Sequence, residues 1–175
     1  MPDGLQREFV PLNLTVLVVS DSRTEKTDKS GKLLEQRLID AGHKLYEKRI
    51  VPDDVYRIRA IVAGWCADEQ VNAVLTTGGT GVTGRDGTPE ALRVLFEKEI
   101  EGFGELFRMI SYEEIGTSSI QSRAIAGVCN GTYVFCLPGS SGACATGWDK
   151  IIARQLDYRT QPCNLVELMP RLRER

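Results

Sequence analysis

Apolar residues are grouped along the chain into short continuous runs and into helical stripes. The run at residues 14–19 is apolar and rich in β-branched side chains, which is typical of a strand buried on both faces of a parallel sheet. A leucine stripe between residues 30 and 41 then predicts a helix, with Ser30 as its N-terminal cap and Gly42 at its end. The chain therefore begins with a strand, a long polar loop and a helix.

This alternation of strand and helix patterns continues along the chain. It predicts an α/β fold, a three-layer α/β/α sandwich with a mostly parallel sheet. A length of 175 residues fits one domain, which we place at residues 13–160, after an N-terminal arm (1–12) and before a tail or short helix (161–175). Further strands are predicted at residues 44–51, 72–77 and 132–137, and further helices at about 54–67, from 88, at 102–114 and at 143–156.

The charge balance excludes some classes of partner. With 22 basic and 24 acidic residues, the formal net charge is −2, which gives no overall field to attract nucleic acid. No apolar run approaches the roughly 20 residues that a membrane helix needs, and the polar N-terminus lacks the apolar centre of a signal peptide. We therefore expect a cytoplasmic protein with neither a nucleic acid nor a membrane as its partner.

The number and spacing of the cysteine and histidine residues argue against several kinds of metal and catalytic site. The five cysteines are scattered and form no Cys-x-x-Cys pair, so a zinc site of the usual spacing is not expected. The single histidine, His43, follows the predicted end of a helix and is read as a turn or strand-start residue. A Ser-His-Asp triad or a histidine-rich metal cluster is therefore disfavoured.

A glycine-rich loop at residues 78–87 follows the third predicted strand. Its glycines expose backbone amides, its threonines add hydroxyl groups, and a helix is expected to begin just after it with Thr88 as the cap. In open parallel sheets, ligands bind beyond the carboxyl ends of the strands. The loop therefore predicts an anion-binding site.

Two familiar nucleotide motifs resemble this loop, but neither fits it. Gly79-x-Gly81-x-x-Gly84 has the spacing of a dinucleotide fingerprint, yet three residues separate it from its helix and it follows the third strand rather than the first. A P-loop needs lysine and then serine or threonine where this chain has Arg85 and Asp86. A Rossmann oxidoreductase and a standard GTPase are both disfavoured.

The same loop resembles a family signature. Thr77-Gly-Gly-Thr-Gly, followed by Arg85-Asp86-x-Thr-Pro-Glu-Ala, is similar to the signature of the MoaB/MogA family of molybdopterin-binding proteins, and Pro-Gly-Ser-Ser-Gly-Ala-Cys at 138–144 is closer to its MoaB branch. The resemblance implies the MogA-like molybdopterin-binding fold and covers nearly the whole chain in order. Its other matches are Ser20-Asp21, Asp28-x-Ser30-Gly31, Pro52-Asp53, Gly102-Phe-Gly104-Glu105, Ser122-Arg123-Ala124 and Leu137-Pro138-Gly139-Ser140.

The resemblance implies a role in molybdenum cofactor biosynthesis. Members bind molybdopterin, a pterin dithiolene with a terminal phosphate, and MogA-type members adenylylate that phosphate with Mg-ATP. Such a transfer needs positioning and charge neutralisation more than covalent help, so it requires no catalytic histidine. We expect a molybdopterin adenylyltransferase that uses Mg²⁺ and holds no tightly bound prosthetic group. A non-catalytic carrier of molybdopterin or nucleotide, or a nucleotide-binding assembly factor, remains the alternative. The resemblance also implies a homo-oligomer, a trimer or a hexamer.

Particular residues are expected to carry these roles. The family motif aligns Asp53 and Asp86 with its catalytic acids, and they are the candidate Mg²⁺ ligands; helix capping and a turn contact are their structural alternatives. Arg123 is expected to pair with a phosphate or with an acidic neighbour. The candidate molybdopterin and phosphate residues are Thr77, Gly78, Gly79, Thr80, Gly81, Pro138, Gly139, Ser140 and Ser141. The candidate nucleotide residues are Ser20, Asp21, Asp28, Ser30 and Gly31.

Overall fold

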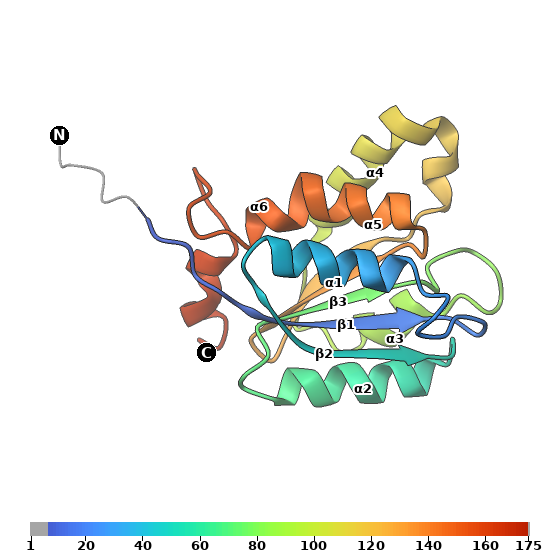
Figure 1. Cartoon of the computed structure of the whole chain (residues 1–175), viewed down its shortest axis with the longest axis horizontal. Helices are drawn as coiled ribbons and strands as arrows, with labels where there is room; N and C mark the ends of the chain where they lie inside the picture. The colour runs from blue at the N-terminus through green and yellow to red at the C-terminus, as the bar shows by residue number, and fades with distance from the viewer. Residues whose placement is uncertain (1–6, 175) are drawn as a thin grey trace.

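Six strands form one mixed sheet in the order β2-β1-β3-β6-β5-β4, as a computed structural model of residues 7–174 describes it (Figure 1). The first four strands in this order are mutually parallel, β5 is antiparallel to β6, and β4 is antiparallel to β5. The expected mostly parallel α/β architecture is confirmed. The strands are β1 (Asn13–Val19), β2 (Lys44–Val51), β3 (Ala73–Thr77), β4 (Lys98–Glu99), β5 (Ile125–Cys129) and β6 (Thr132–Leu137).

Two of these strands were not predicted from the sequence. β4 is two charged residues long, and β5 contains alanine and glycine instead of a continuous apolar run. β5 and β6 form a hairpin through Asn130 and Gly131, which both have positive φ, 47° and 78°. An Asn-Gly pair is the favoured sequence for a two-residue hairpin turn because both positions of that turn require positive φ.

Helices cover both faces of the sheet, as expected for a three-layer sandwich (Figure 1). One face carries α1 (Ser30–Asp40), α4 (Glu101–Ile115) and α5 (Ser141–Gly147), which continues through a π-helical turn (Trp148–Ile152) into α6 (Ala153–Gln155). The opposite face carries α2 (Val55–Ala67) and α3 (Thr88–Arg93). Two 3₁₀ helices, η1 (Gly116–Gln121) and η3 (Val166–Arg171), follow α4 and α6.

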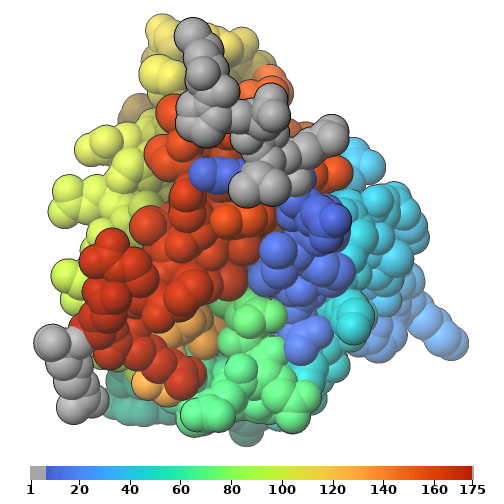
Figure 2. Space-filling model, turned by 90° about the vertical axis from the view of Figure 1, so that its left-hand side faces the viewer, coloured from blue at the N-terminus to red at the C-terminus, as the bar shows by residue number. Residues whose placement is uncertain are grey.

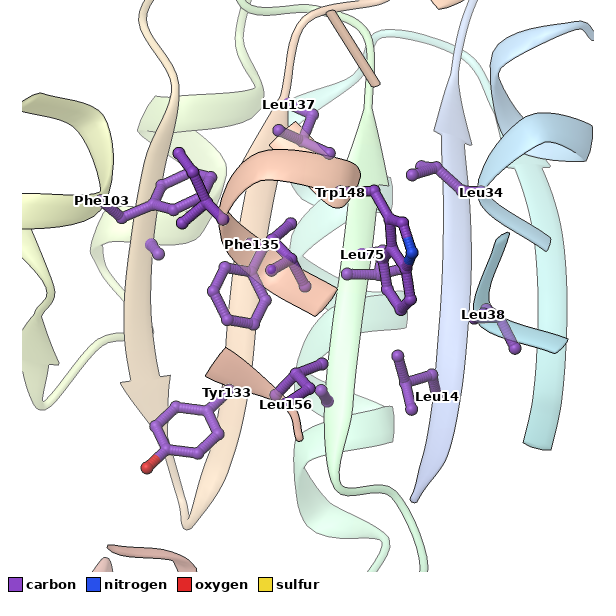
Figure 3. Packing of buried hydrophobic residues seen from close by; sticks show 14 of the residues in the cluster. Leu14, Leu34, Leu38, Leu75, Phe103, Tyr133, Phe135, Leu137, Trp148 and Leu156 are labelled. Atoms are coloured by element: carbon purple, nitrogen blue, oxygen red, sulfur yellow. The ribbon is translucent and has the colours of Figure 1, made fainter. Parts of the chain in front are cut away.

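The two faces of β1 belong to two separate hydrophobic cores because successive side chains of a strand point to opposite faces. Leu14 packs in the larger core with Leu38 of α1 and Trp148, as Figure 3 shows. Leu17 packs in the second core with Ile58 of α2. All of these side chains are buried, so the strand that positions the first functional loop is fixed from both sides.

Helix ends agree only in part with the predicted caps. Gly42 ends α1 with a φ of 93°, as expected, and the Asp54 carboxylate caps α2 by accepting a hydrogen bond from the Arg57 amide at 2.9 Å. The predicted caps Ser30 and Thr88 are wrong. Ser30 already lies inside α1, and the Thr88 hydroxyl donates instead to the Gly78 carbonyl at 2.8 Å.

Residues 7–12 and η3 lie side by side at the end of the sheet opposite the glycine-rich loop (Figure 2). In the N-terminal arm, whose residues 1–6 lie outside the described range, Arg7 forms an ion pair of 3.0 Å with Glu167 in η3. The Leu12 amide donates to Nδ1 of His43 at 3.2 Å, so His43 attaches this arm to the domain. Within residues 7–174, no helix is long and apolar enough to cross a membrane.

Candidate functional site

The functional loops meet where the chain changes direction across the sheet. From β1 the chain passes to β2 on one side, and it then crosses to β3 on the other side of β1. Such a switch point leaves a crevice beyond the carboxyl ends of the two central strands. The loops that converge there are residues 20–29, 52–54, 78–87 and 138–140.

Gly78 fixes the start of the glycine-rich loop between two strands. Its amide donates to the Leu137 carbonyl at 3.0 Å, and its φ is 102°. A Cβ atom at this position would lie 2.1 Å from the carbonyl oxygen of Val19. Only glycine fits a backbone that comes this close to β1 in this conformation.

The next two amides of the loop are those of Gly79 and Thr80. Within residues 7–174, the amides of Gly79 and Thr80 donate to no protein group, although Thr80 is only 4% exposed. Both residues line the cavity described below. Unpaired amides in such a loop are suited to bind an anion, because an anion supplies the missing acceptor.

A cavity of about 510 Å³ opens beside this loop, within the size range of small-molecule sites. The loops after β3 and β6 form one side of it, and α4, η1 and α5 form the other. Seven of the residues predicted from the sequence line it: Gly79, Thr80, Gly81, Asp86, Pro138, Gly139 and Ser140.

Asp86 lies at the edge of this cavity, against the glycine-rich loop. Its Oδ2 accepts hydrogen bonds from the amide and the hydroxyl of Thr83, at 2.9 and 2.6 Å. The Thr83 hydroxyl, followed by the amides of Thr83 and Gly81, holds the pKa of this carboxyl below its usual value. Asp86 is therefore a carboxylate at neutral pH, and it makes the predicted turn contact while it faces the cavity.

Asp53 lies on the other side of the same loop. A Cβ atom at Gly79 would lie 2.6 Å from its Oδ2, while its Oδ1 accepts a hydrogen bond from the Gly87 amide at 3.2 Å. Burial raises the pKa of this carboxyl, and the charges of Asp86 and Asp21 act in the same direction. Asp53 does not line the cavity and does not cap α2, so it flanks the loop from behind.

Arg123 holds the two ends of the glycine-rich loop together. Its Nε donates to the Gly81 carbonyl at 2.8 Å, and its guanidinium donates to the Asp86 carbonyl at 3.1 Å. The third contact is an ion pair with Glu90 at the start of α3. Of the two partners predicted for this arginine, the structure brings it to the acidic neighbour.

The candidate nucleotide residues lie in two different environments. Asp28, Ser30 and Gly31 are buried at the start of α1, where Asp28 accepts from the Gly31 amide at 2.8 Å and pairs with Lys48 at 2.9 Å. Ser20 and Asp21 lie instead at the end of β1, on an open groove of about 570 Å³. Only this second pair lines a surface that a nucleotide could reach.

The remaining predicted residues connect the β3 and β6 loops. The Thr77 hydroxyl donates to the Pro138 carbonyl at 2.9 Å and lies 3.2 Å from Sγ of the buried Cys144. Ser140 caps α5 by accepting a hydrogen bond from the Ala143 amide at 3.1 Å, while Ser141 is absent from the cavity lining. Thr77 therefore contributes to the site indirectly, because its hydrogen bond joins the backbones of the two loops that line the cavity.

Comparison with known proteins identifies this arrangement. The family model described as "Probable molybdopterin binding domain" matches residues 15–158. "Molybdenum cofactor biosynthesis protein B" of Escherichia coli (strain K12) is 54% identical over 157 residues, which cover 90% of this chain and 92% of that protein. The chain belongs to the MoaB/MogA family. The resemblance seen in the sequence is thereby confirmed.

Solved structures of the family share the fold. A crystal structure of molybdenum cofactor biosynthesis protein B superposes with a TM-score of 0.86 at 44% identity, covering 97% of this chain and 100% of that one. The tungsten cofactor synthesizing protein MoaB from Pyrococcus furiosus superposes with a TM-score of 0.72 at 38% identity, covering 82% and 92%. The predicted MogA-like fold is confirmed.

In this member of the MoaB/MogA family, one whole wall of the cavity was missed in the sequence. Phe107, Ser111 and Ile115 recur at intervals of four residues along α4, which places them on one helical face. That spacing was a usable signal, but this helix was predicted from the sequence without any of its residues being assigned to the site. The other missed lining residues are Glu114, Ser118, Gln121, Ser122, Gly142, Ala143 and Thr146.

Proposed function

We propose that this protein binds molybdopterin and transfers the adenylyl group of ATP to the terminal phosphate of the pterin. One observation carries the proposal: the carboxylates of Asp53 and Asp86 flank a glycine-rich loop whose unpaired amides open into a cavity of about 510 Å³. In the reaction, a pterin phosphate oxygen forms a bond to the α-phosphorus of ATP. The bond between the α-phosphorus and its bridging oxygen breaks, and pyrophosphate leaves.

Binding of the pterin phosphate follows from the loop. The amides of Gly79 and Thr80 are donors that a phosphate oxygen would satisfy. The pterin phosphate is already an anion at neutral pH, so the chain needs no general base to prepare the nucleophile. The family description and the names of the relatives, which refer to molybdopterin binding and molybdenum cofactor biosynthesis, support this choice of substrate.

The carboxylates of Asp53 and Asp86, which flank the loop from its two sides, are our candidate ligands for a magnesium ion that accompanies ATP. Mg²⁺ prefers oxygen ligands and usually takes one or two carboxylates together with phosphates and water. The raised pKa of Asp53 reflects a carboxylate that is disfavoured by burial and by neighbouring acids, and a cation would relieve both effects. Within residues 7–174, no cluster of three or more His, Cys, Asp or Glu could hold a metal, so substrate phosphates and water would complete the ligand set. A bound Mg²⁺ would offset the repulsion between the two substrates' phosphates.

The chain's own residues hold the reacting groups in place. Arg123 donates to the carbonyls of Gly81 and Asp86 and pairs with Glu90 of α3, so it ties this part of the loop to α3. Ser20 and Asp21, on the groove beyond β1, are our candidates for contacts to the nucleotide. Positioning of this kind supplies much of the rate enhancement in phosphoryl-type transfers.

We infer a homo-oligomer, a trimer or a hexamer, from the family resemblance. Its support in this chain is a set of exposed apolar side chains on α4 and η1, where Met109, Tyr112 and Ile120 are 60%, 59% and 79% exposed. Large apolar side chains that gather exposed on neighbouring elements are typical of association sites. Light scattering on the purified protein measures the assembly directly.

The experiment measures pyrophosphate released from Mg-ATP and molybdopterin. We expect release by the unaltered protein and at least about a hundredfold less by Asp86→Asn, because a charge that positions the reaction is removed. Asp54→Asn is the matched control, since asparagine caps a helix as well as aspartate does and Asp54 lies outside the cavity. Molybdopterin binding without pyrophosphate release would reduce the function to that of a carrier, and no binding would overturn the proposal.

A further inference from the structure

The cavity beside the glycine-rich loop has two chemically different ends. The end formed by Gly79, Thr80 and Gly81 presents backbone amides. The opposite wall, from α4, η1 and α5, presents the carboxylate of Glu114 and the hydroxyl groups of Ser111 and Thr146. The function proposed above uses the first end and assigns no role to this wall.

Glu114 is held in one orientation. Its Oε2 accepts a hydrogen bond from the Thr146 hydroxyl at 2.8 Å, and its Oε1 lies 3.0 Å from Nζ of Lys150, which is outside the cavity lining. Thr146 is itself only 7% exposed, which restricts the movement of this anchor, while the side chain of Glu114 is 40% exposed. Hydrogen bonds from Thr146 and then Lys150 keep the pKa of Glu114 below its usual value, so it is charged at neutral pH.

This carboxylate still has the capacity to accept further hydrogen bonds. A carboxylate offers about four lone-pair sites, and the two contacts just described use one on each oxygen. Two parallel oxygens match two adjacent N–H donors, as a carboxylate matches an arginine fork. A ring N–H next to an exocyclic amino group presents the same pair of donors.

The walls and the charges of the cavity set the orientation of a ligand. Phe107 and Ile115 supply apolar surface in the cavity lining, which suits a flat ring. A phosphate placed at Glu114 would be repelled by the carboxylate, whereas at Gly79 and Thr80 it meets amide donors. A ligand with a phosphate at one end and a donor-bearing heterocycle at the other fits in one direction only.

We propose that Glu114 determines the specificity of this cavity by accepting hydrogen bonds from the ring N–H and the 2-amino group of a 2-amino-4-oxo heterocycle. The inference rests on the proposed function, because both place a pterin phosphate in the same cavity. It adds a reason for selecting the pterin and for rejecting the adenine of ATP. Adenine carries an amino group beside a ring acceptor, so it cannot offer two adjacent donors to a carboxylate.

The test compares two ligands that differ only at this edge. 6-Hydroxymethylpterin monophosphate has the 2-amino donor, and the corresponding lumazine monophosphate has an oxo acceptor in its place. We expect calorimetry on the unaltered protein to show about tenfold or greater preference for the pterin, the discrimination typical of a two-point hydrogen-bonded edge. Glu114→Gln should bring the two affinities to within about threefold, while Glu113→Gln should keep the preference, because Glu113 is an exposed acid like Glu114 but lies outside the cavity lining.

A second measurement separates this inference from the proposed function. The affinity for inorganic pyrophosphate, measured alone by calorimetry, should be the same in the unaltered protein and in Glu114→Gln, because the glycine-rich end is unchanged. Should Glu114→Gln fail to fold, Glu114→Asp shortens the reach by one methylene and should lose the preference in the same way. A pterin preference that survives either variant overturns the role of Glu114 alone. Failure of the unaltered protein to bind the pterin phosphate overturns the proposed function as well.

Discussion

The guanidinium of Arg85 binds the carboxylate of Asp21 at two points, Nε to Oδ2 at 2.9 Å and a terminal nitrogen to Oδ1 at 2.6 Å. This pair joins the loop after β1 to the glycine-rich loop across the switch point of the sheet. Oδ1 of Asp21 also accepts a hydrogen bond from the Asp53 amide at 3.1 Å. Three loops from three strands therefore meet at one exposed carboxylate, next to a candidate catalytic acid.

Breaking this pair should reduce turnover far more than stability. Both side chains are exposed, and exposed ion pairs contribute little to the free energy of unfolding. Arg85→Ala frees Asp21 and, through it, the backbone of Asp53, and small displacements of a positioning group lower rates by about tenfold to a hundredfold. We expect pyrophosphate release to fall by at least about tenfold with an almost unchanged melting temperature.

A matched variant at the far end of the molecule controls for the loss of an arginine. Arg171 makes a two-point contact with Glu174, at 3.0 and 3.1 Å, and is equally exposed to solvent. Arg171→Ala should leave turnover unchanged. If both variants lowered turnover alike, the link from Arg85 through Asp21 to Asp53 would have no special role.

The parts of this fold that the sequence predicted are those in which one side chain type dominates. Buried strands such as β1 and β3 are largely apolar, and the loops that follow them are rich in hydroxyl groups, with several glycines in the loop after β3. β5 lacks such a run because its Gly127 lies beneath the ring of Phe96, where a Cβ atom would come within 2.4 Å of ring carbons. The tertiary contact, not the local pattern, decides which residue stands there.

The residues of the candidate site likewise fall into those that the sequence predicted and those that it did not. The glycine-rich loop and Asp86 could be predicted because their chemistry lies in consecutive residues. Glu114 could not, because its helix also carries the stripe that packs on the sheet, and nothing local separates a cavity-lining acid from a solvated one. Asp28 illustrates the opposite error: it matches the family pattern, but its side chain is fully buried against Lys48.

The buried pair of Lys48 and Asp28 should behave as a single structural unit. Lys48 is 8% exposed, and its pKa is raised because contacts with Asp28 and Glu25 outweigh the burial that would lower it. Lys48→Met leaves the buried Asp28 charge unpaired, which costs about 3–5 kcal/mol in the free energy of unfolding. Adding Asp28→Asn should recover most of this loss, because asparagine still accepts the Gly31 amide.

Urea unfolding of the two single variants, the double variant and the unaltered protein measures this coupling as a double-mutant cycle. Lys44→Met, at an exposed position of the same strand, is the control and should change stability little. Additive effects of the two substitutions would contradict a coupled pair.

His43 should make stability depend on pH in the weakly acidic range. Burial lowers the pKa of this imidazole from 6.5, against a smaller opposing effect of Asp157, and Nδ1 must stay unprotonated to accept the Leu12 amide. The neutral form is favoured in the folded state, so its contribution is complete above about pH 6.5 and is lost as the pH falls through the lower folded pKa. Unfolding free energies should therefore drop below about pH 6.5.

A variant that cannot titrate isolates this effect from the carboxylates. His43→Phe keeps aromatic packing beside Phe9 and Trp148. It removes the hydrogen bond from the Leu12 amide at every pH, and its own side chain does not titrate. The difference in stability between the unaltered protein and His43→Phe should shrink from pH 7 towards pH 5. A constant difference across this range would mean that His43 does not change its protonation with folding.

Replacement by alanine should change stability differently at two glycines of the same loop. Gly79 has a φ of 66°, and a Cβ atom there would lie 2.3 Å from Oγ1 of Thr88 and 2.6 Å from Oδ2 of Asp53. Gly84, five residues further along, has no atom within 4 Å of the equivalent position. Gly79→Ala should cost about 1–3 kcal/mol and displace the carboxylate of Asp53, whereas Gly84→Ala should be neutral or stabilise by up to about 1 kcal/mol.

Affinity measurements on the same two variants distinguish damage to the anion site from a change in loop flexibility. Because the unpaired amides of Gly79 and Thr80 hold the phosphate in our proposal, Gly79→Ala should weaken the affinity for pyrophosphate by at least about tenfold, measured by calorimetry on folded protein. Gly84→Ala stiffens the same loop without touching those amides, so its affinity should stay within about twofold of the unaltered protein. Equal losses in the two variants would indicate that pyrophosphate responds to loop flexibility and that the amides beside Asp53 are not its binding site.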